Sequence, residues 1–139
     1  MEKYLWFVVL LLLVWLMLRW LDPDLRRSRS YEKELAVREP TPDGDLFASH
    51  FTPGEVAPDV PAFVRRAFAK HMGLPAEKLL PDDDFTYAWA EMDASELIAE
   101  IESAFGVTFS SFEVAQTPCT IRAVSSLVTR IAGSNPPAS

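Results

Sequence analysis

The side chains in this sequence that could do chemistry are few and scattered. Its histidines are His50 and His71, far apart in sequence, and its single cysteine is Cys119. One cysteine excludes an internal disulfide and a cysteine-based metal site. Residues 82–84 are three consecutive aspartates, which point in different directions and lack the ligand spacing of a calcium loop. Loop solvation and helix capping therefore explain these acids better than a cation site.

Catalytic patterns are missing from the sequence. It contains no Ser/His/Asp or Cys/His arrangement, no glycine-rich phosphate loop and no set of metal ligands. We therefore expect no catalytic residue, no metal and no enzymatic activity. The formal net charge is −7, and residues 82–102 hold eight acids and no base. Such a surface repels phosphate backbones, which argues against nucleic acid as a partner and favours a basic protein surface.

The first 21 residues predict a transmembrane helix. Residues 4–18 contain no charge, glycine or proline. Extended to Leu21, the span is about 27 Å long at 1.5 Å per residue, close to the ~30 Å of a bilayer core. A cleavable signal peptide is the alternative, but residues 18–24 offer no small-x-small cleavage site. We expect an uncleaved single-pass anchor through residues 4–21.

The orientation of this anchor follows from its flanking bases. Lys3 on the N-terminal side is balanced by Glu2. The C-terminal flank holds four arginines: Arg19, Arg26, Arg27 and Arg29. The positive-inside rule therefore predicts a cytoplasmic C-terminal body, and the same arginines could contact anionic headgroups.

Residues 22–58 are predicted to be a linker, because they are rich in proline and lack hydrophobic periodicity. Only Asp24–Glu39 could support a short helix, and an extended tether is expected from Glu39 to Pro58. Phe47 and Phe51 are exceptions that would dock onto the folded domain or onto a partner.

Residues 59–133 predict a small bundle of four helices, followed by a frayed tail at 134–139. The first helix is expected over Asp59–Met72, capped by Asp59 and ended by Gly73. The second is expected over Glu91–Phe105, the third within Ser111–Gln116. Thr117 and Pro118 would cap and open the last, which runs to about Ile131. Each long helix has an apolar stripe at helical spacing.

The order of these features resembles the acyl carrier protein family over about residues 59–132. The first helix ends in Met72-Gly73-Leu74, an acidic loop ends in Asp84-Phe85, and the acidic helix carries Glu96-Leu97-Ile98 and closes with Phe105-Gly106-Val107. The resemblance implies an all-α, acyl-carrier-like four-helix bundle. The Asp-Ala-x-Glu-Leu run at residues 93–97 also resembles bacterial acyl-carrier-like domains that lack the modified serine. This implies the inner membrane of a bacterium as the location.

The family's attachment serine is missing at the equivalent position. In carrier proteins an Asp-Ser-Leu motif at the start of the second helix holds 4′-phosphopantetheine. Here these positions fall on Ala90, Glu91 and Met92, and glutamate cannot be esterified to that group. No cofactor is therefore expected. Ser95, one helical turn later, is the alternative attachment site.

Three functions follow from the resemblance. The first is a non-catalytic binding and assembly module, which presents an acidic helix to a lipid- or acyl-metabolism enzyme or to a membrane complex. The second is a membrane-tethered acyl carrier with phosphopantetheine on Ser95. The third is a structural subunit whose transmembrane helix carries the specificity. In the first, the partner-binding residues are Glu91, Met92, Asp93, Glu96 and Glu100, against the plain alternative that these acids form a solvated face.

Overall fold

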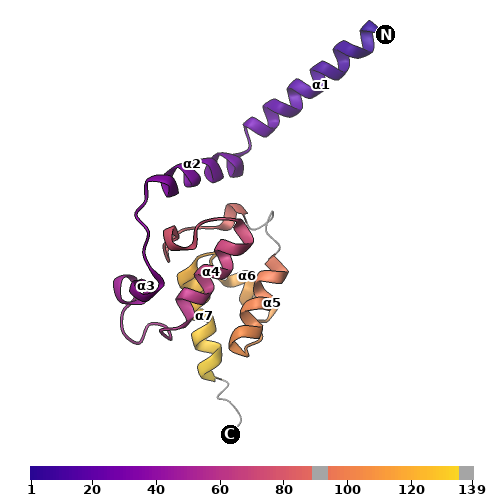
Figure 1. Cartoon of the computed structure of the whole chain (residues 1–139). Coiled ribbons are helices and arrows are strands. Elements are labelled where there is room, and N and C mark those ends of the chain that lie inside the picture. Colours follow the sequence, from indigo (N-terminus) through magenta and orange to yellow (C-terminus); the bar gives the residue numbers. More distant parts are fainter. Residues whose placement is uncertain (89–93, 135–139) are drawn as a thin grey trace. The chain divides into compact units, whose positions relative to one another are not determined.

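The computed structural model of the chain describes residues 1–88 and 94–134. It divides into two compact units, Met1–Val37 and Arg38–Ser139. All regular structure in the described residues is helical, as expected for an all-α protein (Figure 1).

The first unit consists of α1 (Glu2–Trp20) and α2 (Pro23–Val37). No residue of α1 is buried. Within the described part of the chain, it is the one helix long and apolar enough to cross a membrane, a property that signal sequences share. A short turn separates the two helices, and there the Asp22 side chain accepts a hydrogen bond from the Asp24 backbone N–H at 3.0 Å.

The second unit is built around α4, which contacts α7, α5 and α3 (Figure 1). Two short 3₁₀ turns, η1 and η2, lie in the loop after α4. The elements in chain order are α3 (Asp43–His50), α4 (Val60–Met72), η1 (Ala76–Lys78), η2 (Thr86–Ala88), α5 (Ala94–Phe105), α6 (Ser111–Gln116) and α7 (Ile121–Ser134).

Aromatic rings join the helices of the second unit. Phe68 of α4 packs against Phe85 of the loop with ring centroids 5.3 Å apart, and both side chains are fully buried. Phe63 of α4 meets Phe105 of α5 edge to face at 5.2 Å. Burial of such rings is the main source of stability in a small domain. The other fully buried apolar side chains include Val64, Leu79, Leu97, Ile101, Ile121 and Val128.

Several predicted helix boundaries match the structure because they depend on local chemistry. Gly73 ends α4 with a φ of 67°, a left-handed conformation that glycine adopts without strain. Asp59 is the N-cap residue of α4, but its side chain makes no capping hydrogen bond, contrary to the prediction. Ser110 and Glu113 form a reciprocal capping box at the start of α6.

The start of the last helix differs from the prediction. It begins at Ile121 rather than at Pro118, and Thr120 caps it by accepting a hydrogen bond from the Ala123 backbone N–H. The preceding backbone is held elsewhere, since the Phe85 N–H donates to the Cys119 carbonyl at 2.9 Å. The helix also continues to Ser134, past Gly133.

The largest difference concerns residues 38–57, which we call the strap. An extended tether was expected from Glu39 to Pro58, with the folded domain beginning at Asp59. In the structure the second unit begins at Arg38, and the strap contains α3. Its Leu46, Phe51 and Val56 form a buried cluster with Phe47 and Ala62 packed against it. Of the two alternatives for Phe47 and Phe51, the structure has them docked on the domain.

Candidate functional site

An apolar groove with a volume of about 740 Å³ lies between α5, α6 and α7 of the second unit. None of the described residues that line it is basic. Four hydroxyl side chains also line it, from Thr86, Ser95, Ser111 and Thr117. The apolar lining includes Ile98, Ile101, Phe109, Val114, Val124 and Leu127. A lining of this kind suits an apolar group.

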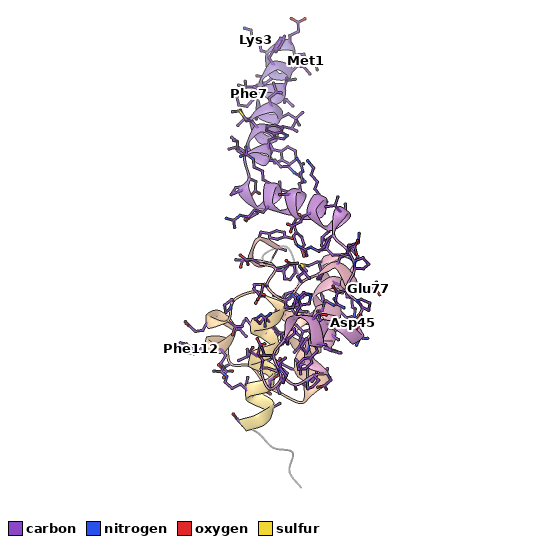
Figure 2. The ribbon with its side chains drawn as sticks, turned by 90° about the vertical axis from the view of Figure 1, so that its left-hand side faces the viewer. Met1, Lys3, Phe7, Asp45, Glu77 and Phe112 are labelled. Carbon is purple, nitrogen blue, oxygen red and sulfur yellow. The ribbon has the colours of Figure 1, made fainter. Side chains whose placement is uncertain are left out.

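The short helix α6 forms one wall of this groove. It has six residues and buries none of them. Val114 of α6 and Val124 of α7 line the groove and are half-buried. On its other side, α6 borders a second hollow of about 570 Å³, lined in part by Phe112 and Arg130. Phe112 is 74% exposed and projects from one side of the second unit, while Asp45 and Glu77 lie on the other side (Figure 2).

Ser95 is exposed at the described N-terminal end of α5 and lines the groove. Its hydroxyl is therefore accessible to a modifying enzyme. The groove offers no lysine or arginine among its described lining residues to pair with a phosphate on that serine. Ser95 is therefore an exposed serine beside an apolar groove, with no basic side chain among the described lining residues.

The five residues predicted to bind a partner fall into three groups. Glu91, Met92 and Asp93 lie outside the described residues. Glu96 is exposed, next in sequence to Ser95. Glu100 is turned toward α4, where its Oε2 lies 2.9 Å from Nε2 of His71.

The pairing of Glu100 affects both its availability and its titration. The hydrogen bond from His71 is the largest cause of a pKa of Glu100 below its usual value, and the charge of Lys70 adds to it. Glu102 is also used inside the domain, because its carboxylate accepts a hydrogen bond from the Phe109 backbone N–H at 2.9 Å. Glu96 is exposed, whereas Glu100 and Glu102 are half-buried.

Cys119 lines the groove as a half-buried thiol. Burial, together with the nearby negative charge of Asp84, raises the pKa of Cys119 to about 12. The thiol is therefore protonated at neutral pH and is a poor nucleophile.

The three consecutive aspartates hold the loop in place. Asp82 accepts a hydrogen bond from Nε of Arg122 at 2.7 Å. Asp83 pairs with Arg38 of the strap at 2.6 Å and also accepts from the Leu80 backbone N–H. Asp84 accepts from the backbone N–H and hydroxyl of Thr86. The described residues contain no group of three His, Cys, Asp or Glu side chains placed to hold a metal ion.

Arg122 of α7 binds several groups of the strap. Besides Asp82, it donates to the carboxylate of Glu55 and to the His50 carbonyl. Its guanidinium also lies 4.6 Å from the centre of the Phe51 ring. The role of Arg122 in holding the strap was not predicted, because its four partners lie at distant positions in the chain.

A buried arginine, Arg65 of α4, adds a further link to the strap. It donates to Asp43 at 2.6 Å and to the Leu79 carbonyl. A charge removed from water requires such a partner, since an unpaired one would destabilise the fold by several kcal/mol. Asp43 is thereby fixed at the start of α3.

Comparison of the chain with known protein families, curated proteins and solved structures finds no match.

Proposed function

We propose that this chain is a membrane-anchored, non-catalytic binding and assembly module of the acyl-carrier-like kind. Residues 4–21 anchor it as a single-pass protein, with the second unit on the cytoplasmic side of a bacterial inner membrane. That unit presents its α5 side to a basic protein surface, of the kind found on a lipid- or acyl-metabolism enzyme or in a membrane complex.

The observation that carries this proposal is an apolar groove bordered by carboxylates. Glu96 stands in sequence between two residues that line the groove, Ser95 and Leu97. Asp84 binds Thr86, a third lining residue. A partner that inserts an apolar side chain into the groove and places a lysine or arginine beside it satisfies both features.

Site-specific crosslinking in bacterial cells tests this function. A photoreactive residue at Ala99, which is exposed on α5, should yield one dominant protein adduct of the full-length chain. The same group at exposed Ala48 of α3 should not. Glu96→Lys should abolish the adduct, whereas Glu77→Lys should leave it, because Glu77 is equally exposed but lies in η1. Equal adducts at Ala48, or insensitivity to Glu96→Lys, would refute the proposal.

A membrane-tethered carrier is the second candidate, favoured by the exposed hydroxyl of Ser95 beside the groove. When bound, 4′-phosphopantetheine would supply a thiol for acyl attachment. The full-length chain, co-expressed with a broad-specificity phosphopantetheinyl transferase, is weighed by intact mass spectrometry. Modification that is lost in Ser95→Ala and kept in Ser103→Ala, an exposed serine on the same helix, would establish the carrier in place of the binding module.

A further inference from the structure

The charged side chains of α2 are arranged with a strongly basic face. Arg26, Arg29 and Lys33 follow one another at intervals of three and four, so they share one side of the helix. Arg27 lies about 100° around the helix axis from Arg26, beside this face rather than on it, and all four bases are exposed. The opposite side carries Ser28, Tyr31 and Leu35. We define the basic face by Arg26, Arg29 and Lys33.

α2 carries four bases and three acids, Asp24, Glu32 and Glu34. Arg26 donates to the Trp20 carbonyl at the end of α1. Arg27, Arg29 and Lys33 have no ion-pair partner among the residues that the structure describes. The net charge of the basic face is therefore available to an anionic partner.

The position of α2 identifies that partner. Leu21 and Asp22 are the residues between α1 and α2, and two residues cannot span more than about 10 Å. Electrostatic attraction in physiological salt acts over about 8 Å. If α1 crosses the bilayer, the first turns of α2 lie within reach of the phosphate groups at its surface.

We propose that α2 is a lipid-binding helix, whose basic face binds the headgroups of anionic phospholipids and holds α2 against the membrane surface. This inference rests on the membrane anchor of the proposed function and adds a ligand class to it. Each base near an anionic surface adds to the attraction.

The test uses the full-length chain with Cys119→Ser and Ser30→Cys, which places an environment-sensitive fluorophore on an exposed position of α2. The chain is reconstituted in phosphatidylcholine vesicles, with or without added phosphatidylglycerol, and quenched by a headgroup-attached nitroxide lipid. We expect quenching to rise about twofold when the anionic lipid is present, and to fall again in high salt.

The variant Arg27→Gln/Arg29→Gln/Lys33→Gln should lose this rise. The matched variant Arg66→Gln/Lys70→Gln/Arg130→Gln removes three exposed bases from the second unit and should keep it. Quenching that is independent of phosphatidylglycerol would overturn the proposal, and so would a dependence on protein concentration alone, which indicates binding to an acidic second copy. Chain that fails to float with the vesicles would contradict the anchor instead.

Discussion

The two sides of the second unit are held together in different ways. On the strap side, three arginines, Arg38, Arg65 and Arg122, each join segments that are distant in sequence. On the side of α5 and α6, Glu100 pairs with Lys70 and forms a hydrogen bond with His71, and α6 buries no side chain. The strap is therefore part of the folded core, whereas the groove side is left uncovered.

The largest expected difference between the two sides comes from removing one phenylalanine from each. Phe51→Ala should lower the free energy of unfolding by about 3 kcal/mol, because a buried ring leaves a cavity in the strap. Phe112→Ala should change it by less than about 0.5 kcal/mol, since that ring is already in water. Urea denaturation of the full-length chain in detergent, followed by circular dichroism, measures both. Similar losses would remove the distinction between the two sides.

The next prediction compares the reaction rates of thiols at two positions on the groove wall. Cys119, with a pKa raised to about 12, should react with a disulfide reagent at neutral pH about 100-fold more slowly in the native chain than in denaturant. A cysteine at exposed Ala115, on the same groove in a Cys119→Ser background, should react like a free thiol. Equal native rates at the two positions would mean that the inner wall is as accessible as the rim.

A smaller loss of stability is expected when Arg122 of α7, which binds the strap, is replaced. Arg122→Gln removes the partner of Glu55 and Asp82 and should cost about 2 kcal/mol. Arg130→Gln, at an exposed position of the same helix, should cost less than about 0.5 kcal/mol.

Hydrogen exchange shows which part of the second unit loses stability in Arg122→Gln. The Ala57 backbone N–H, which donates to Thr129 across the strap at 3.0 Å, should exchange faster in this variant. Protection of Val107, whose N–H donates to the Glu102 carbonyl, should change much less. If both amides exchange faster to the same degree, the strap and groove sides unfold as one.

The smallest effect is a dependence on acid. The backbone N–H of Thr52, with Arg122 second, holds the pKa of Glu55 below its usual value of 4.5. A lowered pKa means that the ionised form stabilises the fold above about pH 4.5, and that this contribution is lost as the pH falls through the folded-state pKa. Thermal unfolding between pH 6 and pH 3 should therefore show a weaker pH dependence in Glu55→Gln than in the unmodified chain. An unchanged slope would mean that Glu55 does not stabilise the strap through its charge.

Much of the helical framework could be predicted, because its signals are local. The apolar run of α1, the end of α4 at Gly73 and the Ser110–Glu113 box of α6 each depend on a few neighbouring residues. The stripe of α5 likewise identified Leu97 and Ile101, which are both buried. Of the candidate site, Ser95 and Glu96 were predicted and lie exposed beside the groove. The groove itself was not predicted.

Contacts between polar groups that are far apart in sequence depend on the tertiary structure. The proline-rich composition of the strap suggested a tether, because no local sequence signal predicts the ion pairs of Glu55 with Arg122 and of Asp43 with Arg65. The local sequence does not distinguish the acids of α5 from one another. In the structure Glu100 forms a hydrogen bond with His71, whereas Glu96 is exposed. Helix and turn propensities act between neighbours, whereas ion pairs and ring packing depend on which surfaces the folded chain brings together. Local sequence signals were therefore enough for most of the helices and their apolar faces, but not for α3 or the start of α7, and the strap and the groove depend on packing.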